Sequence, residues 1–435
     1  MKKILLFISC VLFVDVAYAT TPKFSITTIN MSAGDVFNFS MSAAGTFTVD
    51  CGDGGTLSGT GVSGNIIDRT SNTTYAEYAC TYSTDGIKTI GFDGTATGYN
   101  SNPGQSYQHA PIAFFQNSYV ASVSGDLSAI FPSLGSSYSQ YPRFMYTFAY
   151  STNLTSMSQT LFSGYTSSGE SMFWCTFFGC TNLETIPYGL FDNITTGAES
   201  MFSGTFAYCT GLTSLPSGLF QHITTGATSL FESTFEACTN LQNIPGNLFS
   251  NLTSGADRMF WGTFARTALT HIPENLFSSI TTGADYMFYA MFMNDTALNG
   301  YIPKSTFAGL VTNGSPIVSH MWDSAFYNTN LMTSCPSETI QFITGYESEW
   351  GSVVSCEPYG IASTSYVQGM YEAINNSKMA KLNPNSIEFT PDSTPYGFFT
   401  AVEGAGDKFR FKREEITLPF GSYDNPTGRM SIWLE

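Results

Sequence analysis

Charged residues are scarce in this 435-residue sequence. Only 11 % of the side chains are Asp, Glu, Lys or Arg, and 33 acidic residues outnumber 16 basic ones, for a formal net charge of -17. A nucleic-acid partner requires a basic face that neutralises phosphates, so the charge balance argues against one. With 43 % hydrophobic residues, the composition is typical of a folded extracellular protein kept soluble by hydroxyl and amide groups.

Metal-binding and catalytic signatures are also missing from the sequence. The four histidines are scattered, no cysteines are spaced as C-x-x-C, and neither H-E-x-x-H nor G-x-S-x-G occurs. Residues 59–64 match G-x-G-x-x-G, but no hydrophobic strand leads into them and no helix is expected after them. We interpret them as a glycine-rich hairpin loop. The sequence therefore predicts no enzyme, no catalytic residue, no metal site and no cofactor.

One long apolar run occurs, from Ile4 to Val14, and it is too short for a bilayer span of about 20 residues. Lys2 and Lys3 precede this run, and an A-x-A cleavage pattern ends at Ala19. This arrangement is typical of a secretory signal peptide. We expect residues 1–19 to be removed, the mature chain to be secreted or held at the cell surface, and no segment to span a membrane.

The middle of the chain repeats itself with a period of about 29 residues, which lies in the range that indicates stacked repeats. Five phenylalanines mark successive copies at a nearly constant spacing: Phe173, Phe202, Phe231, Phe260 and Phe288. Weaker copies flank these, so the array covers at least residues 145–336. Self-similarity at a fixed period predicts units that bury their apolar faces against their neighbours.

Each copy divides into two halves that predict different secondary structure. In the second copy, Ala198, Phe202 and Phe206 lie at i, i+4 and i+8, which predicts a helix with one apolar stripe. The segment from Leu212 to Pro216 predicts a short strand, which the proline ends. Stacking such units predicts an α/β solenoid with a parallel sheet on one face and a row of helices on the other.

The repeat resembles the leucine-rich-repeat superfamily, in particular the BspA-type surface repeats of bacteria. The pattern F-x-x-C-x-x-L-x-x-I-P runs from Phe177 to Pro187 and recurs, with Leu in place of Ile, at Phe206–Pro216 and then at Phe235–Pro245. From Met259 onward the pattern drifts, and we align Arg266 with the cysteine. The resemblance implies a leucine-rich-repeat solenoid over residues 104–355 of a bacterial surface protein.

Residues 20–103 alternate between apolar and polar side chains, which predicts a small all-β domain. The segments Phe47–Gly54 and Tyr82–Ile90 resemble the PKD type of immunoglobulin-like sandwich. Cys51 stands where that family has an aromatic anchor, and Cys80 stands where it often has a polar residue. The resemblance therefore implies a Cys51–Cys80 disulfide that compensates for the lost anchor.

The remaining cysteines divide into two groups. Cys335 and Cys356 bracket the end of the repeat array and are a second candidate disulfide pair. The four cysteines of the repeat are predicted to be buried free thiols and not disulfide partners. These are Cys175, Cys180, Cys209 and Cys238. The alternative is a bridge between the first two, Cys175 and Cys180, which depends on the distance between them in the fold. Residues 356–435 resemble no family and are predicted to form a small C-terminal α+β module.

Two rows of residues in the repeat are candidate ligand contacts. The concave row contains the residue before the Ile or Leu that precedes the proline of each repeat. It consists of Thr185, Ser214, Asn243 and His271. The aromatic row follows the repeat phenylalanine and contains Trp174, Trp261 and Tyr289, whose rings can stack on sugars or on a partner protein. The alternatives are ordinary solvated strand residues for the first row and helix packing for the second.

We therefore expect an adhesin-like, non-enzymatic bacterial protein that binds an extracellular protein or glycan through its solenoid. One alternative is a carbohydrate-binding or carbohydrate-processing surface protein, for which Trp174 and Trp261 should be exposed. The other is a structural spacer that displays the C-terminal module. The pattern favours no particular oligomeric state.

Overall fold

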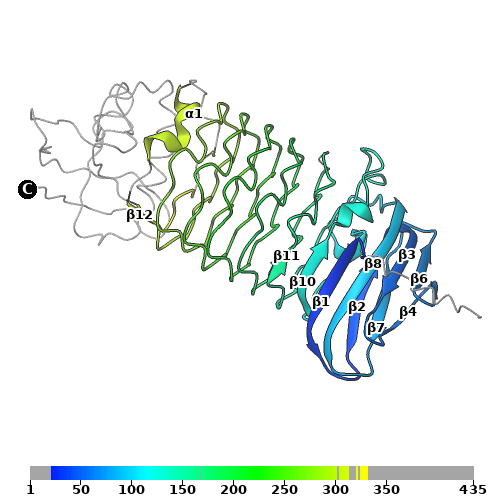
Figure 1. Ribbon diagram of the computed structural model, residues 1–435. Helices are drawn as coiled ribbons and strands as arrows, with labels where there is room; N and C mark the ends of the chain where they lie inside the picture. Colours follow the sequence, from blue (N-terminus) through cyan, green and yellow to red (C-terminus); the bar gives the residue numbers. More distant parts are fainter. Residues whose placement is uncertain (1–20, 168, 301–302, 313–319, 322–323, 332–435) are drawn as a thin grey trace, which may run out of the picture.

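The computed structural model describes residues 21–331 except 168, 301–302, 313–319 and 322–323 (Figure 1). The predicted signal peptide, the candidate pair Cys335 and Cys356, and the predicted module at 356–435 lie outside the described residues.

Two β-sheets form the N-terminal part of the described chain (Figure 1). Their strands are β1 Phe24–Met31, β2 Val36–Met41, β3 Ala44–Asp50, β4 Thr56–Gly59, β5 Val62–Ser63, β6 Ile66–Arg69, β7 Ala76–Thr81, β8 Gly86–Gly98, β9 Ile112–Ala113, β10 Val120–Gly125 and β11 Ser156–Met157. The seven-stranded sheet has the order β11-β10-β1-β8-β3-β6-β5, and the four-stranded sheet has the order β4-β7-β2-β9. All neighbours are antiparallel except β10 and β11, which are parallel.

Aromatic side chains from alternate strand positions pack the two sheets together. Phe24 and Ile26 of β1 are fully buried, whereas Ser25 between them is partly exposed. The ring of Phe39 from β2 meets that of Phe92 from β8 at 5.3 Å between centroids, nearly at right angles. Edge-to-face packing of this kind adds to the stabilisation from apolar burial.

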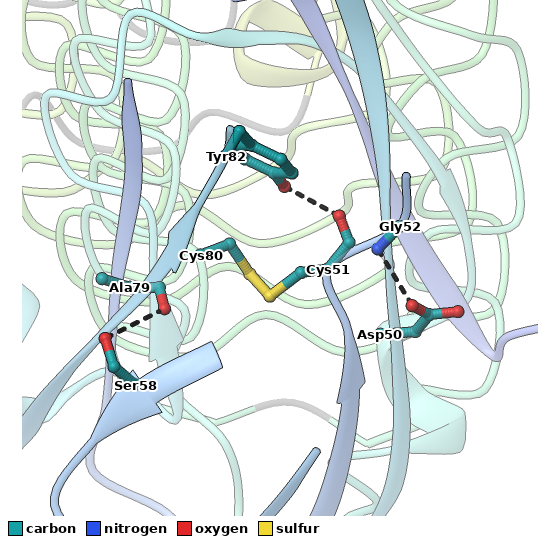
Figure 2. The surroundings of a disulfide bond; sticks show 7 residues. All are labelled: Asp50, Cys51, Gly52, Ser58, Ala79, Cys80 and Tyr82. Carbon is teal, nitrogen blue, oxygen red and sulfur yellow. Dashed lines mark hydrogen bonds between the residues drawn. A yellow bond between two sulfur atoms is a disulfide. The ribbon is translucent and has the colours of Figure 1, made fainter. Parts of the chain in front are cut away.

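A disulfide between Cys51 and Cys80 joins the two sheets, which confirms the predicted pair (Figure 2). Cys51 directly follows β3 of the larger sheet, and Cys80 lies in β7 of the smaller one. The Tyr82 hydroxyl donates a hydrogen bond of 2.8 Å to the Cys51 carbonyl. The crosslink therefore ties the two sheets together within the core.

The repeats form a stack of rungs built from turns, visible in Figure 1 as successive loops beside the sheets. In each rung, alternate amides donate to the next rung: Phe173 N–H bonds to the Met201 carbonyl, and Phe177 N–H bonds to the Thr205 carbonyl, both at 2.9 Å. The amides between them donate to the carbonyl three residues earlier, as Thr176 does to Phe173. Overlapping turns thus provide hydrogen-bond partners for the backbone amides and carbonyls without a helix.

The predicted α/β leucine-rich-repeat solenoid of helix-plus-strand units is wrong. Among the described residues the only α-helix is α1, Ala308–Thr312, and the 3-10 helices are η1 Tyr107–His109, η2 Leu127–Ala129 and η3 Lys304–Phe307. The segment predicted to be helical in the second copy has positive φ at Ser200, Gly204 and Tyr208, which a right-handed helix cannot contain. The spacing of four between its apolar residues reflects a four-residue turn period.

The strand predicted in each repeat is also largely absent from the described rungs. The segment 212–216 contributes a single parallel bridge, between Ser214 and Asn243. Towards the end of the stack, β12 (Asn299–Gly300) and β13 (Asn330–Leu331) form one short parallel pair. No continuous parallel sheet therefore runs along the described part of the array.

Three ladders of stacked phenylalanines fill the stack. One ladder runs through Phe148, Phe177, Phe206, Phe235, Phe264, Phe292 and Phe326, with neighbouring centroids 5.3–5.8 Å apart and rings nearly parallel. Each ring is fully buried, which contributes about 1.5–3 kcal/mol per side chain. The same buried cluster continues into the sandwich as far as Phe24, so sheets and rungs share one core.

Buried threonine and cysteine side chains tie neighbouring rungs together. Thr205 Oγ1 donates to the Phe173 carbonyl at 2.8 Å, and equivalent threonines do so in other rungs. The repeat cysteines are free and buried, as predicted, and the alternative bridge between the first two is wrong. Cys209 Sγ donates to the Phe177 carbonyl at 3.1 Å, and burial raises the pKa of this thiol. These thiols therefore act as packing and hydrogen-bonding groups.

Candidate binding surface

The concave row is exposed throughout, as the residues Thr185, Ser214, Asn243 and His271 all face solvent. Ser214 and Asn243 form a parallel bridge between adjacent rungs, and His271 Nδ1 lies 3.2 Å from the hydroxyl of its sequence neighbour Thr270. The row is an accessible polar edge in which side chains do not converge on a common point.

The aromatic row is divided between two clusters. Trp174 is half-buried and packs edge-on against Tyr146, with 4.9 Å between ring centroids. Trp261 is also half-buried, three rungs away, and packs against Tyr289 at 4.2 Å with the Arg258 guanidinium 5.5 Å from its ring. The structure thus brings Trp261 and Tyr289 together and places Trp174 in a different group of rings.

That group is a connected set of partly exposed rings, which we call the aromatic patch. Seven ring contacts with centroid distances of 4.5–6.2 Å link its members. They are Tyr75, Tyr107, Phe115, Tyr146, Tyr150, Trp174, Phe178 and Tyr208. The most exposed are Tyr150 at 42 % and Tyr208 at 40 %. Contiguous exposed apolar surface of this kind marks interaction sites.

The patch spans the junction between the sandwich and the stack. Tyr75 directly precedes β7, Tyr107 lies in η1, and Phe115 follows β9. The other five rings come from the first three rungs: Tyr146 and Tyr150 from the first, Trp174 and Phe178 from the second, and Tyr208 from the third. The segment around Phe115 is itself held by the first rung, because the Phe114 and Gln116 amides donate to the carbonyls of Thr147 and Ala149. Backbone bonds therefore fix both halves of the patch relative to each other.

Within the rungs, large and small residues alternate in antiphase along two neighbouring positions. One position holds Tyr150, Gly179, Tyr208, Ala237 and Arg266, all with positive φ. The other position holds Ala149, Phe178, Ala207, Glu236 and Ala265. Rungs lie about one strand spacing, ~4.8 Å, apart, and at these two positions a large residue in one rung is followed by a small one in the next. The large side chains therefore form a zigzag from rung to rung, which consists of Tyr150, Phe178, Tyr208, Glu236 and Arg266.

Gly179 shows why the zigzag requires this alternation. A Cβ added at Gly179 would lie 2.9 Å from the Tyr150 ring, which covers the backbone there. Phe178 fits between the two tyrosines, with centroids 5.3 Å from Tyr150 and 5.1 Å from Tyr208. Beyond Tyr208 the zigzag continues as the ion pair between Glu236 and Arg266. The alignment of Arg266 with the cysteine is wrong, since Arg266 takes the Tyr208 position and Thr267 follows in the cysteine position.

The patch carries no formal charge at neutral pH. Burial raises the pKa of Tyr146, and a side-chain hydrogen bond with Cys175 contributes in the same direction. Its hydroxyl therefore stays protonated. The pKa of Arg266 is also raised, chiefly by its hydrogen bond with Glu236, and this cation is paired with the Glu236 carboxylate. The surface offers rings and hydroxyls without an unpaired ion.

Over the described residues, no group of three or more His, Cys, Asp or Glu side chains is placed to hold a metal ion. In the same part of the chain, no helix is both long and apolar enough to cross a bilayer. No family model, no curated protein and no solved structure matches this chain. The surface therefore has to be interpreted from its own chemistry.

Proposed function

We propose that the protein is an adhesin-like, non-enzymatic binding protein, secreted or held at the surface of a bacterium, with the aromatic patch as its contact surface. Its ligand is an extracellular protein or glycan. The observation that carries this proposal is the connected, partly exposed set of eight rings at the junction of sandwich and stack.

The rings are held in place before any ligand arrives, which supports binding. The amides of Tyr146 and Tyr150 donate to the carbonyls of Trp174 and Phe178 on the next rung. Little conformational entropy is lost when such rings bind, because their backbone is already fixed. Tyrosine and tryptophan also contribute disproportionately to binding energy, since one end is apolar and the other can hydrogen-bond.

The Cys51–Cys80 disulfide supports an exported location. Structural disulfides form and persist in oxidising compartments and are rare in the cytosol. The bond joins two sheets in the core, where it has a structural role. This agrees with the signal-peptide pattern at the start of the sequence.

A binding screen of residues 20–435 on protein, mucin and glycan arrays tests the proposal. We expect the wild-type chain to bind a ligand and the double variant Tyr150→Ala, Tyr208→Ala to lose most of that signal. Tyr188→Ala is the matched control, because Tyr188 is 58 % exposed and lies outside the patch. Binding that survives in the double variant, or no binding to any array, would contradict the proposal.

A further inference from the structure

We infer that the ligand of the aromatic patch is a neutral, extended glycan chain, whose sugar rings lie along Tyr150, Phe178 and Tyr208. This inference rests on the proposed function and adds the ligand's chemical class. It follows from the spacing of the rings, the polar groups beside them and the charge of the protein.

The spacing of the zigzag matches a polymer with a two-unit repeat. Tyr150 and Tyr208 occupy the same position two rungs apart, which places them about 9.6 Å from each other along the stack. This distance is close to the advance of a disaccharide in an extended β-linked glycan, where alternate sugars are turned over. Equivalent faces of every second sugar therefore meet the two tyrosines, and Phe178 meets the sugar between them.

Tyrosine hydroxyls belong to the zigzag itself, and two amide side chains follow it closely in the sequence. Asn153 and Asn182 follow Tyr150 and Gly179 by three residues, and their side chains are linked by a 3.4 Å hydrogen bond from one rung to the next. A sugar presents an apolar C–H face and a rim of hydroxyls. The aromatic ring faces can stack on the apolar C–H face of a sugar, and the amides and tyrosine hydroxyls can hydrogen-bond with its hydroxyl rim.

The charge of the protein favours a neutral glycan as the ligand. The whole chain has a formal charge of -17, which disfavours approach of a polyanion. Within the zigzag, the cation of Arg266 is already paired with Glu236. Since no unpaired cation lies in the zigzag to offset the repulsion, uronate-rich or sulfated chains are excluded in favour of uncharged ones.

Affinity electrophoresis tests the inference with residues 20–435 and gels that contain mixed-linkage β-glucan, hydroxyethylcellulose or polygalacturonate. We expect retardation by a neutral polysaccharide and none by polygalacturonate. Calorimetry with oligosaccharides of that polymer should give a Kd raised about fivefold by Tyr150→Ala and by Tyr208→Ala. Tyr188→Ala should bind as the wild type does, and Tyr150→Phe should retain most of the affinity because it keeps the ring.

Three results would overturn the inference. The first is no retardation by any neutral polysaccharide, and the second is retardation by polygalacturonate alone. The third is a glycan affinity that Tyr188→Ala weakens as much as Tyr150→Ala does. A protein ligand whose array signal depends on Tyr150 and Tyr208, without glycan binding, would overturn the inference and leave the proposed function standing. Thermal unfolding of each variant, compared with wild type, shows that binding losses do not come from misfolding.

Discussion

Replacing Thr205 with valine removes one buried hydrogen bond between two rungs without changing the shape of the side chain. Thr205 is fully buried, and its hydroxyl donates to the Phe173 carbonyl at 2.8 Å. The same carbonyl also accepts the Thr176 amide at 3.1 Å, so the substitution leaves it with one partner. The experiment therefore isolates a side-chain bond and leaves no buried acceptor without a partner.

The expected cost is about 1 kcal/mol. Net contributions of single hydrogen bonds cluster near that value, and the larger penalty for an orphaned acceptor does not apply here. Equivalent bonds occur at Thr176 and Thr234, so the triple valine variant should lose about 3 kcal/mol if the rungs act independently. A larger loss would indicate cooperativity between neighbouring rungs.

Urea unfolding followed by tryptophan fluorescence measures this effect as a lower midpoint with an unchanged slope. Thr224→Val is the matched control, because Thr224 is exposed and its hydroxyl also donates to the previous rung, to Thr195 at 3.1 Å. We expect the control to cost less than about 0.5 kcal/mol. If Thr205→Val costs no more than Thr224→Val, the buried threonine ladder does not hold the rungs together.

Three further predictions concern other parts of the molecule. Gly179→Ala should destabilise the protein by about 1–2 kcal/mol and weaken ligand binding, because φ is +69° there and the new Cβ would meet the Tyr150 ring; thermal unfolding and the array signal check both effects. Burial raises the pKa of Asp295 well above its ordinary value, and its Oδ2 has no hydrogen-bond partner. Stability should therefore be greatest below the unfolded pKa of about 4 and fall as the pH rises towards the folded pKa, a slope that Asp295→Asn should flatten in thermal scans between pH 4 and 8. Replacing both Cys51 and Cys80 with alanine should cost about 3–4 kcal/mol from the 29-residue loop that the disulfide closes, and reductant should then have no further effect on the unfolding midpoint.

The sequence predicted the features that depend on identical residues recurring at a fixed separation. Phenylalanines one repeat apart, such as Phe177 and Phe206, do stack on one another, and repeat cysteines such as Cys180 are free and buried. Secondary structure within the repeat was predicted wrongly, because a spacing of four fits a helix and a four-residue turn equally well. The positive φ values at Ser200 and Tyr208 decide between them, and neither residue type signals such a conformation by itself.

The aromatic patch was beyond the sequence prediction for two reasons. Tyr75 and Phe115 join it through the packing of the sandwich against the first rung, which no local pattern encodes. Within the array, the large residues Tyr150 and Tyr208 recur in every second copy of the repeat, and a comparison of single copies hides this longer period. A search for alternation between odd and even copies would have indicated the zigzag.

Hydroxyl-radical footprinting of residues 20–435, with and without the strongest array ligand, tests most directly whether the aromatic patch is the binding surface. We expect the ligand to protect Tyr150, Trp174 and Tyr208 from oxidation and to leave the exposed Tyr188 as reactive as in the free protein. A ligand that binds but leaves the patch tyrosines unprotected, or that protects Tyr188 instead, would contradict this assignment.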